Sequence, residues 1–239
     1  MATRVNATAE YYLRTASLPS IATFTLSCYV RLVTQASLAN QVSPLFYRND
    51  GAGDAAWAGV YLRWLLASND TRISMDATAT AQTDGTILTI GSWYHVGFTR
   101  SGNVYTTYLN GVQDIQFTDA SAMTNTRMYI AGNDFTGGTY PSFDVAAVKI
   151  WDGVALTASE LLTESRQVSP FRVNNLHSFY PLLSIAEDET DYYTGGLTAT
   201  VSGTFTTSPD GPPIPWQIYR NRADPYQVPV ARRFILGTH

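Results

Sequence analysis

The chain has 239 residues, of which 45% are hydrophobic and 13% aromatic, so it can bury the core of one large domain and is not disordered throughout. Only 14% of the residues are charged, and the net charge of -4 comes without basic clusters in the body, so nucleic acid is not expected as a partner. No apolar run approaches the length that crosses a bilayer, and we expect no membrane insertion.

Cysteine usage and the N-terminus limit the chemistry further. The only cysteine, Cys28, excludes an internal disulfide and a metal site built from several thiolates. It lies in the strand-like run 24–30, where a lone cysteine is usually a small core residue. Residues 1–8 lack the charged start and apolar stretch of a secretory signal, so we do not expect export by that route.

Strand-like runs follow one another along the first part of the chain, separated by Gly, Asn, Asp and Ser. Short strands at this spacing predict an antiparallel sandwich rather than a parallel α/β sheet. The runs lie at 11–14, 24–32, 45–47, 57–66, 72–75, 86–90, 127–131 and 143–151.

The strongest local pattern runs from Trp93 to Phe117. It predicts a three-stranded meander, with strands at 93–100, 104–109 and 112–117. Asn110-Gly111 between the last two strands is the preferred two-residue hairpin turn. Alternation places Val96 and Phe98 on the core side of their strand.

The segment after residue 140 predicts a strand and the only convincing helix. In the strand 143–151, alternation places Ala146, Val148 and Ile150 toward the core and Lys149 on the opposite side. Thr157 and Glu160 have the spacing of a capping box, which predicts a short helix that ends near residue 166.

The chain returns to strand character after residue 170 and then changes composition. We expect the segment 177–203 to join the strand near residue 11 in one sandwich, because chain ends often meet. The last 32 residues hold six of the eleven prolines. We therefore divide the chain into a sandwich at 1–207 and an extended arm at 208–239.

Several of these pieces resemble the laminin G-like branch of the concanavalin A-like lectin/glucanase superfamily. Residues 24–31 look like its early inner strand, and residues 92–100 with 108–111 look like its central signature. Residues 130–132, 143–151 and 155–161 look like its closing strand and small helix. Together they cover roughly residues 9–167.

The resemblance implies a jelly-roll-like sandwich of two antiparallel sheets. The sequence departs from the family at Asp144, where Gly is usual, so the local turn is expected to differ. The resemblance does not by itself imply sugar binding, because many members of this fold are adhesion or assembly modules.

Catalysis is not expected. Glycanases of this fold carry carboxylates at alternate positions of one strand, so that these project into one cleft. Glu187, Glu189 and Asp191 have this spacing, but they lie outside the resemblance and precede a Gly pair, and we interpret them as a solvated loop. His95 belongs to the central signature, and we interpret it as a hydrogen-bonded structural residue.

The resemblance also leaves a calcium site and a glycan site open. Loop carboxylates and carbonyls suit Ca²⁺, although Asp and Asn are common in loops for conformational reasons, so no cofactor is required. The candidate ligands are Asp50, Asp54, Asn133, Asp134 and Asp144. A glycan needs an aromatic platform and short polar groups, although 57–66 fits a core strand equally well. The candidates are Asp54, Trp57, Trp64 and Tyr140.

The arm is expected to dock on a partner, as part of a homo-oligomer or of a larger protein shell. Its aromatic and Arg residues are types enriched at interface cores. They are Trp216, Tyr219, Arg220, Arg222, Tyr226, Arg232, Arg233 and Phe234.

Two functional classes therefore stay open. One is a non-catalytic structural or assembly module of a virus or phage particle, as a capsid decoration or tail protein. Such a protein leaves its host inside a particle and needs neither a signal nor a disulfide. The other is a carbohydrate-binding lectin or adhesin that recognises cell-surface glycans. The expected location is a virion or other extracellular particle, with the cytoplasm as the alternative.

Overall fold

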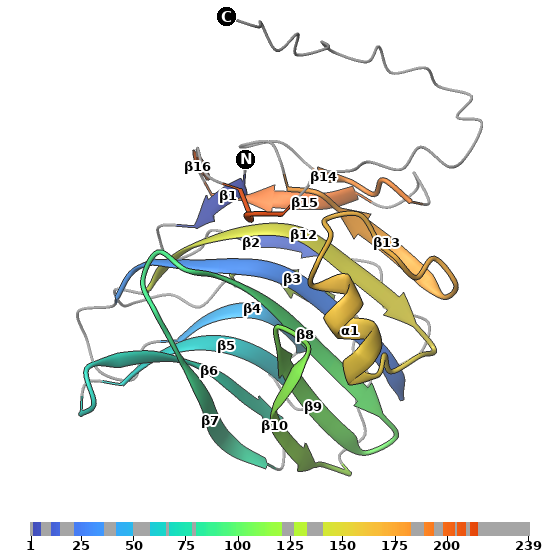
Figure 1. The fold of residues 1–239 in the computed structure, drawn as a ribbon, viewed down its shortest axis with the longest axis horizontal. Coiled ribbons are helices and arrows are strands. Elements are labelled where there is room, and N and C mark those ends of the chain that lie inside the picture. The colour runs from blue at the N-terminus through green and yellow to red at the C-terminus, as the bar shows by residue number, and fades with distance from the viewer. Residues whose placement is uncertain are drawn as a thin grey trace, which may run out of the picture.

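The computed structural model contains two antiparallel sheets stacked as a sandwich (Figure 1). This confirms the two-sheet, all-β fold predicted from the sequence. One short helix, α1 (Ala158–Glu164), lies in the described part, which contains no helix long and apolar enough to cross a membrane. The described residues are 2–5, 11–14, 22–35, 42–49, 58–65, 67–77, 80–120, 127–132, 141–182, 189–193, 198–203, 205–208 and 211–214.

Each sheet has eight strands, and every strand pair is antiparallel. The first sheet has the order β10 (Val112–Thr118), β9 (Val104–Leu109), β8 (Trp93–Ser101), β3 (Thr23–Thr34), β12 (Ser142–Asp152), β1 (Ala2–Val5) and β16 (Thr206–Ser208), and β13 (Leu176–Tyr180) also pairs with β12. The second has the order β14 (Glu189–Thr190), β15 (Thr198–Ser202), β2 (Tyr11–Arg14), β11 (Arg127–Ile130), β4 (Val42–Asn49), β5 (Ala58–Leu65), β6 (Asp70–Ala77) and β7 (Thr80–Leu88).

The predicted meander is confirmed as β8, β9 and β10. Asn110 and Gly111 have φ values of 53° and 81°, the left-handed conformation that a two-residue hairpin turn requires at both positions. A Cβ atom on Gly111 would lie 2.5 Å from the Cα atom of Leu162, so the glycine also makes room for α1. Turn and helix are therefore packed against each other.

Early and late parts of the chain meet in both sheets, and the contact between the segment 177–203 and the strand near residue 11 was predicted. Strand β15 pairs with β2, with Val201 opposite Tyr12, and β16 pairs with β1, with Thr207 opposite Thr3. Contacts of the sandwich continue to Ile214, which packs against an apolar cluster on the first sheet. The division at residue 208 stays a prediction, because residues 215–239 lie outside the described part.

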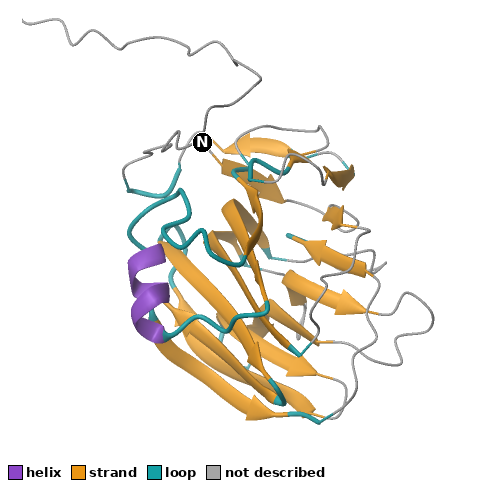
Figure 2. Cartoon of the chain, turned by 90° about the vertical axis from the view of Figure 1, so that its right-hand side faces the viewer, coloured by secondary structure: helices purple, strands orange, loops and turns teal. Residues whose placement is uncertain are grey.

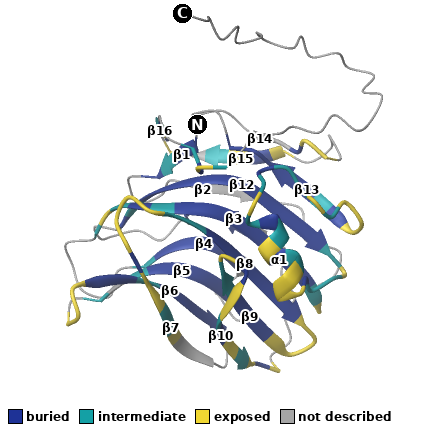
Figure 3. Cartoon of the chain, in the orientation of Figure 1, coloured by how far each residue is buried: buried dark blue, intermediate teal, exposed yellow. Residues whose placement is uncertain are grey.

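The main core lies between the two sheets. It joins Val96 and Phe98 of β8 with side chains from the second sheet such as Leu62 and Met75, and all four are buried. Figure 3 shows that β3, β12 and β5 are buried along most of their length. The predicted orientation of Val96 and Phe98 is therefore confirmed. Phe98 also packs edge to face against Phe24, with ring centroids 5.6 Å apart.

Strand β12 corrects one expectation. Phe143 and Val145 face the core between the sheets, and so do Val148 and Ile150, but Ala146 packs on the outer side. The cause is a bulge between residues 146 and 149, centred on residue 147 with φ 51°. An extra residue in a strand shifts the alternation of side chains by one position. Odd-numbered residues of β12 therefore face the core before the bulge, and even-numbered residues face it after the bulge.

Helix α1 covers the outer side of the first sheet, as Figure 2 shows edge-on. Its capping box is confirmed, because Thr157 Oγ1 accepts from the Glu160 N–H and Glu160 Oε2 accepts from the Thr157 N–H. Lys149 lies on this side, as predicted, but it is fully buried under the helix. Its Nζ atom is 2.6 Å from Glu164 Oε2 and donates to the Gln167 carbonyl at 3.0 Å.

The buried ion pair makes a stability prediction. Lys149→Met leaves the Glu164 carboxylate buried without its cation, so the free energy of unfolding should fall by about 3 kcal/mol. Adding Glu164→Gln should restore part of the loss, because it removes the unpaired charge. The control is Arg72→Gln, which breaks a partly exposed pair with Asp70 and should cost much less than Lys149→Met. Urea unfolding measures all three, and equal losses for Lys149→Met and Arg72→Gln would contradict the account.

Candidate functional site

Most of the site residues predicted from the sequence lie outside the described part. These are Asp50, Asp54, Trp57, Asn133, Asp134 and Tyr140, together with the arm residues from Trp216 to Phe234. Trp64 lies in β5, but its side chain is not described. The glycan set and most of the calcium set therefore stay predictions. No group of three or more His, Cys, Asp or Glu side chains that could hold a metal ion occurs among the described residues.

Asp144 corrects the expectation of a loop ligand, because it lies in β12 and is fully buried. Its Oδ1 accepts from Arg4 Nε at 2.8 Å, and its Oδ2 accepts from Arg31 Nε at 2.8 Å and from Ser208 Oγ at 2.9 Å. Arg4 and Arg31 stand directly opposite Asp144 on the two neighbouring strands. Protein donors thus occupy both oxygens, and the residue joins β12 to three other strands instead of facing a calcium ion.

Asp191 corrects the interpretation of the acidic segment as a solvated loop. Its side chain is fully buried, and Oδ1 accepts from the backbone N–H groups of Phe179 and Tyr193, each at 2.9 Å. Glu189 lies in β14, and Glu187 lies outside the described residues. A carboxylate that accepts two backbone donors is a structural acceptor, which the spacing of the acids did not indicate.

His95 is structural, but not in the way that we expected. It is buried, and neither ring nitrogen has a hydrogen-bond partner within the described part of the chain. Its ring meets the Tyr29 ring edge to face, with centroids 5.0 Å apart. Burial, with a smaller effect from the Lys149 charge, holds the pKa of His95 well below its usual range, so the ring is neutral at physiological pH.

The outer face of the second sheet carries an aromatic row. Tyr47 lies between Tyr61 and Tyr129, with ring centroids 6.2 and 6.1 Å away, and all three rings are buried. Beyond Tyr61, Arg63 donates to both oxygens of Asp84, at 2.9 and 3.1 Å, and Ser74 donates to the same carboxylate. Because the three rings are buried, they stabilise this face and do not offer a free aromatic platform to a sugar.

Asp76 lies on the same face, and the pKa of its carboxyl group is strongly raised. Burial raises its pKa to about 7, although the Tyr61 hydroxyl and the Arg63 charge act in the opposite direction. Its Oδ1 atom has no hydrogen-bond partner among the residues that the structure places. The period-two spacing of Tyr61 with Arg63, and of Ser74 with Asp76, was the signal in the sequence for a polar face here.

A second surface lies beside α1, where large apolar side chains are exposed. We define the aromatic patch as Phe171, Val173, Tyr192 and Tyr193, whose exposed fractions are 62%, 52%, 63% and 46%. The Tyr193 hydroxyl donates to the Val173 carbonyl at 3.2 Å, which joins the two segments of the patch. The sequence signal was an aromatic pair in a polar loop and apolar residues just after Pro170, and both lie outside the family resemblance.

Buried groups fix the backbone of this patch. Glu164 Oε1 accepts from the N–H groups of Phe171 and Arg172, at 2.8 and 2.9 Å, and Trp151 Nε1 donates to the Arg172 carbonyl at 2.7 Å. Asp191 holds the Tyr193 N–H in the same way. The exposed side chains therefore stand on a backbone that is already ordered, which lowers the entropy cost of binding a partner.

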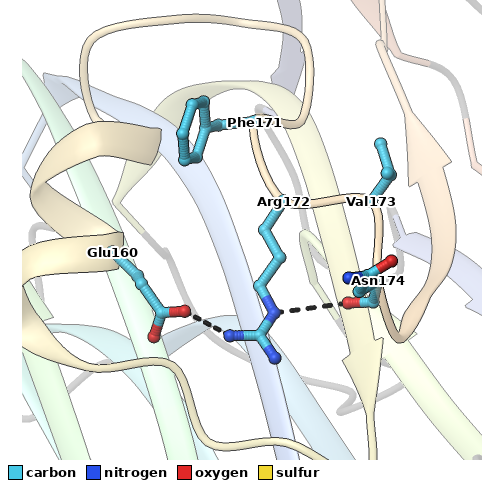
Figure 4. A pocket seen from close by; sticks show the side chains of 5 residues that line it. All are labelled: Glu160, Phe171, Arg172, Val173 and Asn174. Atoms are coloured by element: carbon cyan, nitrogen blue, oxygen red, sulfur yellow. Dashed lines mark hydrogen bonds and ion pairs between the residues drawn. The ribbon is translucent and has the colours of Figure 1, made fainter.

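An open depression lies at one end of the patch (Figure 4). The Arg172 side chain crosses it, forms an ion pair with Glu160 and donates to the Asn174 carbonyl. Phe171 and Val173 complete the lining. Because the charges of Arg172 and Glu160 offset each other, the depression favours a neutral or apolar occupant over a small anion.

Comparisons with known proteins agree with the fold. A family model described as the concanavalin A-like lectin/glucanases superfamily matches residues 6–162. No curated protein sequence matches the chain. A heptameric SAP-like pentraxin from Limulus polyphemus is 14% identical, with a TM-score of 0.51, over 69% of this chain and 82% of its own.

Two further solved structures are similar. A proposed carbohydrate-binding protein from Bacteroides ovatus is 20% identical, with a TM-score of 0.58, over 88% of this chain and 63% of its own. Tailspike protein 2 of the Escherichia coli O157:H7 bacteriophage CAB120 is 15% identical, with a TM-score of 0.52, over 75% of this chain and 26% of its own. At such identities the likeness concerns the fold alone.

Asp76 makes a pH-dependent prediction. Its folded-state pKa of about 7 lies above the usual value of 3.8, so its contribution to stability is full below pH 3.8 and is lost as the pH rises to about 7. Asp76→Asn carries no charge at any pH, so at pH 8 it should raise the free energy of unfolding, by up to about 4 kcal/mol.

At pH 4 the variant and the wild type should be nearly equal. The matched control is Asp84→Asn on the same face, which should destabilise at pH 8 because it weakens the pair with Arg63. Urea unfolding at the two pH values measures both. A destabilised Asp76→Asn at pH 8 would contradict the assignment.

Proposed function

Because the chain belongs to the laminin G-like branch of the concanavalin A-like lectin/glucanases superfamily, we propose that it is a non-catalytic structural module that binds other subunits in an assembled particle. In its full form the proposal places the protein on a virus or phage particle, as a capsid decoration or tail protein. The observation that carries it is the aromatic patch beside α1.

The patch has the properties of a protein-binding surface. Phe171, Val173, Tyr192 and Tyr193 are each close to half exposed or more. Exposed apolar residues on a monomer are usually scattered singly, and a group of them on one surface marks an interaction site. Aromatic side chains are also enriched in interface cores, where they supply large contact areas at a low cost in side-chain entropy.

The placement of the buried acids supports a non-catalytic role. A glycanase of the retaining or inverting type needs two carboxylates that face one cleft. Here Asp144 accepts from two arginines, Glu164 from a lysine and two backbone N–H groups, and Asp191 from two backbone N–H groups. Each of these acids is fully buried and is used as a structural acceptor.

The particle setting is supported by the composition of the arm, in which prolines, arginines and aromatic residues alternate. Segments of this kind order when they bind and can cover a large surface of a partner. A sandwich of similar fold occurs in a bacteriophage tailspike protein, which makes a particle a reasonable setting to test.

Carbohydrate recognition is a second candidate, favoured by the fold, whereas the row of Tyr47, Tyr61 and Tyr129 is buried. A protein of similar fold from Bacteroides ovatus has been proposed to bind carbohydrate.

The two candidates differ in what the arm should do. A chain that ends at Ile214 keeps β16 and the Ser208 bond to Asp144, so the sandwich should fold. We expect the truncated chain to be monomeric and to fail to enter the particle, whereas the full chain associates. Light scattering gives the mass, and co-purification with the particle gives incorporation. A truncated chain that associates as the full chain does would contradict the assembly role and leave carbohydrate recognition as the stronger candidate.

A further inference from the structure

We propose that the aromatic patch is the surface on which the outer part of the C-terminal arm, residues 215–239, of a second copy of this chain docks. The inference rests on the proposed function and specifies which surface receives the arm. Four observations support it: where the chain leaves the described structure, the length that remains, its composition and its charge.

The chain leaves the described structure next to the patch. Ile214, the last described residue, packs against the outer apolar cluster that contains Tyr29, Val168 and Phe179. The Phe179 ring in turn meets the ring of Tyr192 edge to face, with centroids 6.4 Å apart. The arm therefore begins at the same outer cluster that Tyr192 of the patch contacts through Phe179.

The remaining length allows the arm to reach another subunit. About 25 residues follow Ile214. At the polyproline rise of about 3.1 Å per residue, they span up to about 75 Å, which exceeds the width of a small domain. Because the arm starts beside the patch, two copies whose patches face each other can exchange arms reciprocally. Reciprocal exchange gives a closed dimer with twofold symmetry, in which both contacts are of the same arm-to-patch kind.

The composition of the arm suits an aromatic surface. Pro215, Pro225 and Pro229 have a fixed φ, so a segment that contains them loses less backbone entropy when it binds. Proline-rich segments are recognised by surfaces lined with aromatic rings. The patch supplies three such rings on an ordered backbone, from Phe171, Tyr192 and Tyr193.

Charge favours the same occupant. Residues 215–239 contain four Arg and one Asp, so they carry +3, and the remainder of a chain with net charge -4 carries -7. A basic arm is attracted to an acidic body, and the attraction speeds their encounter. At the patch itself, the charges of Arg172 and Glu160 offset each other. The patch therefore does not repel the basic arm, and apolar side chains of the arm can pack there.

Three full-length variants test the proposal. The patch variant is Phe171→Ser with Tyr192→Ser, and the arm variant is Trp216→Ser with Tyr219→Ser. The control is Val112→Ser, which changes a residue that is 68% exposed on the β9–β10 hairpin. All changes in the described part affect exposed side chains, so each variant should fold, which circular dichroism and thermal melting check.

Light scattering over a concentration series should find the wild type and the control associated. The patch variant and the arm variant, each alone, should lose association at least about 10-fold, because each lacks one half of every contact. An equimolar mixture of the two should regain a mixed pair, because one copy supplies an intact arm and the other an intact patch.

Each remaining outcome overturns the inference. If the patch variant associates as the wild type does while the arm variant does not, the arm docks elsewhere, although the assembly role stands. If both variants dissociate but their mixture does not pair, the arm is not exchanged between copies. If the wild type is monomeric at every concentration, both the inference and the assembly role fail.

Discussion

The carboxylate of Glu164 is fully buried, and a buried charge is stable only when opposite charge and hydrogen-bond donors surround it. One oxygen accepts from Lys149 of β12, and the other accepts from the backbone of Phe171 and Arg172. A single side chain thus joins the central strand of one sheet, the helix and the exposed patch. Burial lowers the pKa of Lys149, and the Glu164 carboxylate opposes this shift, so each member of the pair stabilises the charge of the other.

Two other buried acids, Asp144 and Asp191, also accept hydrogen bonds from several segments of the chain and so hold these segments together. Asp144 joins β12 to the strands on both sides and to Ser208 of the last strand, and Asp191 joins β13 to the loop that carries Tyr193. These three acids are used to hold late parts of the chain onto the sandwich. The surface beside them carries the ordered apolar side chains of the aromatic patch. Such side chains suit the binding of a partner and carry no catalytic group.

The sequence predicted the features that depend on neighbouring residues. The capping box at Thr157 and the Asn110-Gly111 turn are local signals, because their hydrogen bonds and φ values are determined within four residues. The two-sheet fold followed from strand spacing and from the family resemblance. The alternation in β8 held because that strand has no bulge in its pairing with β3.

The features that the sequence did not predict depend on distant partners. Nothing in Ala146-Ala147 marks a bulge, although Ala147 has a positive φ and the pairing of β12 with β3 shifts there. Asp191 resembled a loop acid because its donor, the Phe179 N–H, is twelve positions away. The aromatic patch could not be recognised as a surface, because exposure depends on what the rest of the chain leaves uncovered.

The central claim is that this sandwich is a structural module whose patch receives the arm of a neighbour. Electron cryomicroscopy of the wild-type assembly tests it most directly. The account predicts density for residues 215–239 of one copy against Phe171 and Tyr192 of the next. A patch that faces solvent in the assembly, with the arm bound elsewhere, would contradict it.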